Sequence, residues 1–149
     1  MGSNKYSGAH KKIENIERKL KSSDQKDIES KPESLMEELR NSGEKYSEED
    51  IIFIVRQQNG KIAWLEKGKR TAGLEHIIRR HSKQFQDIGI KENLIPELIK
   101  EAIVNGKIIG KQGNGPTPGD IYAVDFMEKK LIIMISISDN GFIVTAHPR

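Results

Sequence analysis

The chain contains no cysteine among its 149 residues. A disulfide framework, a zinc site built on thiolates and a cysteine nucleophile are therefore all excluded. The absence of cysteine says nothing about the cellular compartment, so any chemistry has to come from other side chains.

Long apolar runs are also missing. The longest run, residues 131–135, has the length of a strand, whereas a transmembrane helix needs roughly 20 apolar residues. Hydrophobic residues make up 35% of the sequence and aromatic residues only 5%. A chain of this length and composition builds one modest core, so we expect one globular domain with a polar segment outside it.

The net charge is small but unevenly distributed. Twenty-five Lys and Arg against 22 Asp and Glu give +3. Acidic residues are concentrated between positions 24 and 50, and basic residues dominate from Lys61 onward. This asymmetry predicts that any site for a polyanion lies in the second half of the chain.

Residues 1–46 are polar and are predicted to form a helical linker or delivery segment. Apolar residues at helical spacing indicate a solvated helix over residues 9–21. A second helix begins near Pro32 and ends at the Asn41-Ser42-Gly43 break. The apolar stripes of both helices are thin, so neither is expected to build a core by itself.

Residues 47–149 are predicted to form the folded domain, of the α+β class. The strand signals are β-branched or aromatic runs bounded by turn residues, and the helix signals are apolar residues three and four apart. We expect helices packed on one face of an antiparallel sheet, which combines an early hairpin with a C-terminal three-stranded meander. The expected elements are a hairpin of residues 51–56 and 61–65, helices over 73–85 and 94–105, a short strand over 107–111, and strands over 121–126, 131–138 and 142–147.

The helix over residues 73–85 carries the most informative pattern. At about 100° per residue its apolar side chains fall within one arc, which has to pack against the sheet. His81 lies in the middle of that arc, whereas His76 is expected on nearly the opposite side, beside Arg79 and Arg80. A histidine on an apolar stripe is either a hydrogen-bonded core residue or part of a reactive site.

No metal or nucleotide cofactor is expected. His76 and His81 are five positions apart rather than the four that allow one helix face to bind one ion, and no carboxylate is placed to complete a site. The glycine-rich stretch 110–115 is not followed by Lys-Ser or Lys-Thr and a helix, so it is interpreted as a loop and not as a phosphate cradle.

A metal-free acid–base site fits the residues better. Cleavage of RNA requires a base for the 2′-hydroxyl, an acid for the leaving 5′-oxygen and donors around the phosphate. In the last strand, alternation places Ile143, Thr145 and His147 on one face. The candidate catalytic residues are His81, His76, Thr145 and His147, and the candidate phosphate-binding residues are Arg79, Arg80, Lys83, Lys69 and Lys111. The structural alternatives are a core histidine at position 81 and ordinary solvated charges on the helix.

Three segments together resemble a known group of proteins. They are residues 62–68 (IAWLEKG), 72–85 (AGLEHIIRRHSKQF) and 138–144 (SDNGFIV). They resemble the C-terminal toxin domains of bacterial polymorphic and contact-dependent inhibition systems, within the superfamily of barnase, EndoU, colicin and RelE-like (BECR) ribonucleases. The likeness covers about residues 47–149 and leaves the polar segment outside it.

The resemblance implies a metal-independent ribonuclease toxin, often directed at tRNA, with a cognate immunity protein as its partner. It also implies a secreted effector domain that acts in the cytoplasm of a target bacterial cell. In that superfamily a helix with His or a basic residue packs beside a sheet whose later strands supply Thr, Ser, His or Tyr; here His76 and His81 match the helix and Thr145 the strand. The alternative is a non-catalytic nucleic-acid- or protein-binding module of a phage or mobile element, whereas a deaminase or DNA nuclease is disfavoured by the lack of cysteine and of a metal cluster.

Overall fold

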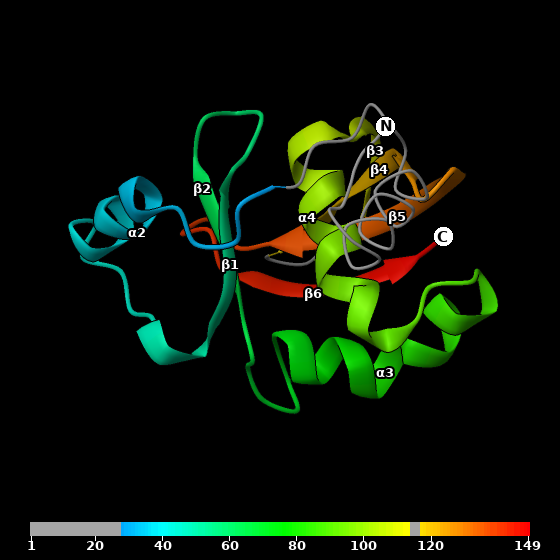
Figure 1. Ribbon diagram of the computed structural model, residues 1–149, viewed down its shortest axis with the longest axis horizontal. Helices are drawn as coiled ribbons and strands as arrows, with labels where there is room; N and C mark the ends of the chain where they lie inside the picture. The colour runs from blue at the N-terminus through cyan, green and yellow to red at the C-terminus, as the bar shows by residue number, and fades with distance from the viewer. Residues whose placement is uncertain (1–27, 114–116) are drawn as a thin grey trace, which may run out of the picture.

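The computed structural model describes residues 28–113 and 117–149, and the helix expected over residues 9–21 lies outside these ranges. The described chain is α+β, with three α-helices and two antiparallel sheets, which confirms the predicted class (Figure 1). The elements are α2 (Glu33–Arg40), η1 (Glu48–Asp50), β1 (Ile51–Arg56), β2 (Ile62–Glu66), α3 (Leu74–Asp87), η2 (Glu92–Leu94), α4 (Ile95–Asn105), β3 (Lys107–Gln112), β4 (Gly119–Phe126), β5 (Lys129–Ile137) and β6 (Ile143–Pro148).

The two sheets are a β1–β2 hairpin and a four-stranded sheet in the order β3-β4-β5-β6. The meander expected from the sequence has three strands; β3 pairs with β4 and adds a fourth. The turn between β4 and β5 is also tighter than predicted. It consists of Met127 and Glu128, both at positive φ (50° and 64°), and Phe126 pairs with Lys129. A two-residue turn of this kind is usually signalled by Asn-Gly, so its boundary could not be placed from this sequence.

The main core lies between the four-stranded sheet and the helices α3 and α4. In Figure 1, α4 crosses in front of the sheet and α3 runs along β6. Ile77 and Phe85 of α3 and Leu98 of α4 are fully buried against Ile133 and Ala146 of the sheet. The predicted apolar stripe of α3 is therefore a packing face, which fixes the helix beside the last strand.

A second, smaller core joins α2 to the β1–β2 hairpin. Leu35, Met36 and Leu39 of α2 pack with Ile54 and Trp64. The described part of the segment predicted as a linker is thus folded onto the hairpin, while the domain boundary at residue 46 stays a prediction.

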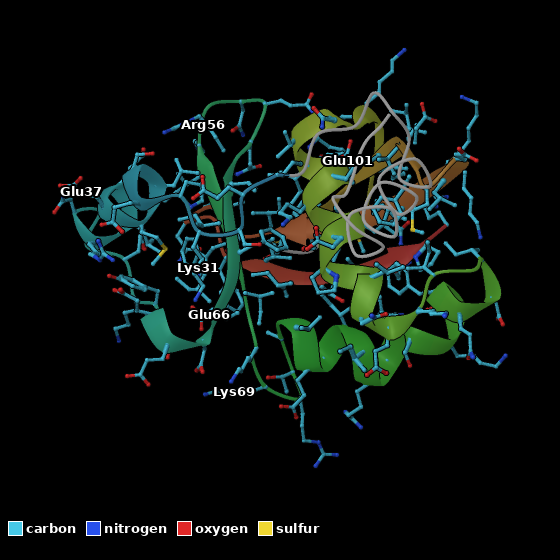
Figure 2. All side chains as sticks on the ribbon, in the orientation of Figure 1. Lys31, Glu37, Arg56, Glu66, Lys69 and Glu101 are labelled. Carbon is cyan, nitrogen blue, oxygen red and sulfur yellow. The ribbon has the colours of Figure 1, made fainter. Side chains whose placement is uncertain are left out.

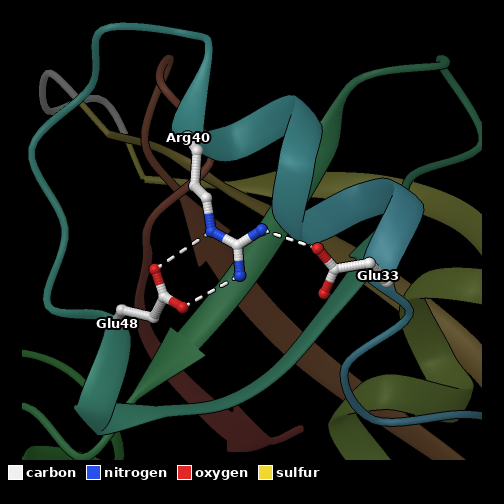
Figure 3. Close-up of polar contacts among 3 residues, drawn as sticks. All are labelled: Glu33, Arg40 and Glu48. Atoms are coloured by element: carbon white, nitrogen blue, oxygen red, sulfur yellow. Dashed lines mark hydrogen bonds and ion pairs between the residues drawn. The ribbon is translucent and has the colours of Figure 1, made fainter.

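Arg40 connects α2 to η1. Its guanidinium donates to Glu33 of α2 (2.7 Å) and, through two nitrogens, to Glu48 of η1 (2.9 and 3.2 Å), as Figure 3 shows. These partners raise the pKa of Arg40, and Arg40 lowers the pKa of Glu48. Arg40 therefore holds α2 and η1 together through one carboxylate on each.

The buried Lys100 ties the start of the described chain to α4. Its Nζ donates to the Ile28 carbonyl (2.9 Å) and the Ser30 hydroxyl (3.0 Å) and lies 3.2 Å from the Glu97 carboxylate. A buried ammonium requires such partners, because an unpaired charge in the core is strongly destabilising. We therefore interpret Lys100 as a structural anchor.

The hairpin meets the four-stranded sheet at β6. The backbone N–H of Trp64 donates to the Gly141 carbonyl (2.9 Å), and the Trp64 ring packs edge-on against Phe142. Gly141 has φ 107°, and a Cβ there would lie 2.5 Å from the Ile62 carbonyl oxygen, so only glycine fits. This contact fixes where β6 begins.

Candidate active site

A bulge in β6 determines which face of the sheet each side chain of the candidate site points to. Ser136 of β5 pairs with Thr145 and the next residue, Ile137, pairs with Ile143, so Val144 is the extra residue. The strict alternation predicted for this strand is therefore wrong at one place. Ile143 and Ala146 both enter the main core, whereas Thr145 and His147 flank Ala146 and point to the other face.

The loop of residues 67–73 docks the start of α3 on this bulge. The Gly73 N–H donates to the Val144 carbonyl (3.0 Å), and the Glu75 N–H donates to the Lys67 carbonyl (2.8 Å). Gly68 and Gly73 lie back to back, and a Cβ on Gly68 would lie 2.2 Å from the Ala72 carbonyl oxygen. The two glycines thus permit the tight loop that brings α3 against β6.

Three imidazoles meet between α3 and β6. The ring centroids of His81 and His147 are 5.0 Å apart, and those of His76 and His81 are 6.2 Å apart. The prediction that His76 and His81 point away from each other is wrong. Their Cα–Cβ bonds diverge around the helix, but long side chains lean over the preceding turn and their rings can approach each other.

Each imidazole has its Nδ1 hydrogen bonded to an oxygen acceptor. His76 Nδ1 bonds to the Arg70 carbonyl (3.0 Å), His147 Nδ1 to the Pro148 carbonyl (2.8 Å), and His81 Nδ1 to Oε1 of Gln84. A carbonyl oxygen only accepts, so Nδ1 must carry the proton in all three rings. Each neutral ring therefore keeps a free lone pair on Nε2, the tautomer that a general base requires.

The environment keeps His81 neutral. Burial is the main cause that lowers its pKa below the usual 6.5, and the positive charges of His147, His76 and Arg80 act in the same direction. The hydrogen bond to Gln84 partly opposes these effects. At neutral pH His81 is therefore mainly an unprotonated imidazole with an available Nε2.

The Thr145 hydroxyl is buried and has no hydrogen-bond partner among the described residues. A buried hydroxyl without a partner costs about 1–3 kcal/mol, so such an atom calls for an explanation. Thr145 lies two residues from His147 on the same side of β6, about 7 Å along the strand.

The predicted phosphate-binding cations divide into two groups. Lys83 pairs with Asp87 (2.9 Å) and Lys111 with Asp120 (2.8 Å), both on the surface. The remaining cations are exposed and have no ion pair within the described ranges; Figure 2 shows one of them, Lys69, on the loop before α3. These unpaired cations are Lys69, Arg79 and Arg80.

The other flank of α3 borders an open hollow. Its volume is about 400 Å³, and its lining residues are Lys67, Leu74, Glu75, Ile78 and Arg79. None of the three imidazoles lines it, so α3 separates the hollow from the histidine cluster.

Two contributors to the site were missed in the sequence. The Arg70 carbonyl orients His76, and a backbone acceptor leaves no signal in the sequence. Gln84 orients His81, and its position three residues further along the same helix was a usable signal, because such side chains are neighbours.

Comparison with protein-family models and with curated proteins found no match to this chain. Within residues 28–113 and 117–149, no group of three His, Asp or Glu side chains is arranged to bind a metal ion. In the same ranges, no helix has the length and apolar character needed to cross a membrane.

Proposed function

We propose that this chain is a metal-independent endoribonuclease, a toxin domain directed at RNA and most specifically at tRNA. The observation that carries the proposal is the cluster of three imidazoles, each with Nε2 free, next to an unsatisfied hydroxyl on β6. Such groups supply an acid, a base and a phosphate donor at neutral pH without a metal ion.

In this proposal His81 is the general base. Its lowered pKa favours the neutral ring, and Nε2 takes the proton of the 2′-hydroxyl while the 2′-oxygen attacks phosphorus. His76 is the general acid, which gives a proton from Nε2 to the departing 5′-oxygen. The P–O5′ bond breaks, and the products are a 2′,3′-cyclic phosphate and a free 5′-hydroxyl. An in-line displacement needs acid and base on opposite sides of phosphorus, so the wider His76–His81 pair is preferred over His81–His147.

Thr145 and Arg80 hold the phosphate. The Thr145 hydroxyl donates to a non-bridging oxygen, and the unpaired Arg80 guanidinium neutralises the charge that develops there. His147 packs against His81 and keeps it in place. We further propose that α3 and α4 cover the same face of the four-stranded sheet, which leaves the face with Thr145 and His147 for RNA.

The biological setting follows from the same proposal. A ribonuclease of this kind is lethal to the cell that makes it, so a cognate immunity protein is the expected partner. An acidic surface on that protein would complement Lys69, Arg79 and Arg80. The domain would act in the cytoplasm of a target bacterium.

The test is incubation of the purified protein with total tRNA in the presence of EDTA. We expect cleavage with 2′,3′-cyclic phosphate ends, reduced by roughly 10²- to 10⁴-fold in His81→Ala. Gln86→Ala, at an exposed position near the end of α3, is the control and should cleave like the unmodified protein. RNA that is retarded on a gel but stays intact would contradict the proposal and favour the non-catalytic binding module.

A further inference from the structure

The apolar arc of α3 is wider than the core requires. Ile77 is fully buried, but Leu74 and Ile78 are only partly buried and line the hollow on the other flank of the helix. Lys67, Glu75 and Arg79 complete its lining. The hollow therefore combines a small aliphatic surface with two cations and one carboxylate.

A basic loop connects the hollow to the histidine cluster. Lys67 lines the hollow, Lys69 and Arg70 follow it in the exposed loop, and the Arg70 carbonyl holds the ring of His76. A polyanion bound at the imidazoles can thus follow this loop around the start of α3. An α-helix with its side chains is about 10 Å wide, a span that a few nucleotides of single-stranded RNA cover.

We propose that the hollow binds a nucleobase and the adjoining phosphate of the RNA strand that is cleaved at the histidine cluster, at a position a few nucleotides from the scissile bond. This inference rests on the proposed function. The face of the base lies on Leu74 and Ile78, and Lys67 and Arg79 contact the phosphate. The Glu75 carboxylate accepts a hydrogen bond from an exocyclic amino group, as carboxylates do with cytosine N4.

The dimensions favour a nucleotide over a protein partner. A volume of about 400 Å³ lies within the range of small-ligand sites, roughly 300–1,000 Å³. A stable protein interface covers about 800 Å² per partner around a sizeable apolar core, and two aliphatic side chains surrounded by charges do not provide one. Base stacking on a small floor with flanking cations is, by contrast, a common way to bind single strands.

The experiment measures binding without cleavage. Fluorescence anisotropy follows binding of 2′-O-methyl oligonucleotides, which lack the attacking hydroxyl, to the whole chain at several salt concentrations. We expect Lys67→Ala/Arg79→Ala to weaken binding by about tenfold or more and to reduce the slope of log K against log salt by about 0.7 to 1.4, the contribution of one to two phosphate contacts. Glu75→Gln should change the preference between cytosine-rich and uracil-rich oligonucleotides.

Lys91→Ala is the control, because Lys91 is also exposed and does not line the hollow. It should bind within about twofold of the unmodified protein, and circular dichroism should be the same for all variants. Affinity, salt slope and base preference that are unchanged in the hollow variants overturn the inference, and leave the hollow to a protein partner. If the hollow variants bind as expected but the unmodified protein cuts no RNA, the proposed function fails and the nucleotide site stands.

Discussion

α2 and α3 are both amphipathic helices with charged outer faces, but they differ in how many of their cations form ion pairs with described residues. Arg40 is bound by Glu33 and Glu48, and Arg56 of the adjacent β1 pairs with Glu38 (2.7 Å). In α3, Lys83 pairs with Asp87, while Arg79 and Arg80 have no ion pair with any described residue. The single cation of α2 is therefore paired, whereas two of the three Lys and Arg residues of α3 have no ion pair among the described residues.

The polar atoms beside the two helices differ in the same way. Around α2 the charged groups hold one another and connect the helix to η1. Beside α3 the described residues leave three Nε2 atoms and the Thr145 hydroxyl without an assigned role in the fold. The two regions therefore differ more in hydrogen-bond and ion-pair partners than in charge. Beside α2, polar groups stabilise the fold, whereas beside α3 several polar groups have no such partner among the described residues.

The largest expected effect is a contrast between His76→Ala, which should lose RNA cleavage, and Leu39→Ala, which should lose stability. His76→Ala should lower RNA cleavage by roughly 10²- to 10⁴-fold and leave the free energy of unfolding nearly unchanged, since the ring is only partly buried. Leu39→Ala in α2 should lower that free energy by about 2–5 kcal/mol, because Leu39 is fully buried in the second core. Urea unfolding and a cleavage assay on both variants check this, and an unfolding free energy of His76→Ala as low as that of Leu39→Ala would make His76 a structural residue.

The next effect compares two arginines. Arg80→Ala should weaken RNA binding several-fold and lower the salt slope by about 0.7, with no change in thermal unfolding. Arg40→Ala should lower the midpoint of thermal unfolding, since it leaves Glu33 and Glu48 without their partner, and should bind RNA normally. Fluorescence anisotropy measures the RNA affinity of both variants, and calorimetry measures their thermal unfolding. Equal RNA affinity of the two variants would show that an arginine without an ion pair binds RNA no better than a paired one.

Much of this fold could be predicted from local patterns. The stripe of α3, the Asn-Gly turn of the first hairpin and the β-branched runs of β4 to β6 are signals within a few residues, and each gave the right element. The packing of α2 on Trp64 was not predicted, because a thin stripe does not indicate which distant surface will cover it. The strand over 107–111 was predicted, but its pairing with β4 was not, because β3 is exposed along most of its length and has no apolar alternation to indicate a partner.

The candidate site residues could be chosen from the sequence, but their spatial arrangement could not. Thr145, His147, His76 and His81 were chosen from residue type and periodicity, and the bulge at Val144 and the docking of residues 67–73 bring their elements together. A bulge depends on pairing with β5, and the approach of two rings depends on side-chain rotamers. Neither can be derived from helical or strand periodicity, so the opposed orientation expected for His76 was wrong.

Thr145 offers a smaller effect with opposite signs in the two measurements. Thr145→Val removes a buried hydroxyl that lacks a partner, so stability should rise by about 1 kcal/mol, while cleavage should fall because the phosphate loses a donor. Thr71→Val, at an exposed position in the loop before α3, is the control and should change stability by less than about 0.5 kcal/mol. Loss of stability in Thr145→Val would mean that the hydroxyl has a structural partner, and the comparison with α2 would lose its clearest example.

The smallest effect concerns the titration of His81, which faces His147 from β6 and His76 and Arg80 from its own helix. The hydrogen bond to Gln84 raises the pKa of His81, so Gln84→Ala should lower that pKa further, whereas Gln84→Glu should raise it by placing a carboxylate beside Nδ1. NMR titration of the His81 ring measures this without any RNA, with Gln86→Ala as the control. Because the folded pKa lies below 6.5, the unfolded state binds more protons in the window between the two values, and the free energy of unfolding should fall as the pH drops through it. Gln84→Ala should extend this pH window to lower values, and Gln84→Glu should narrow it. Identical titrations of His81 in both variants would show that Gln84 does not hold the ring. The assignment of a free Nε2 to His81 would then lose its structural basis.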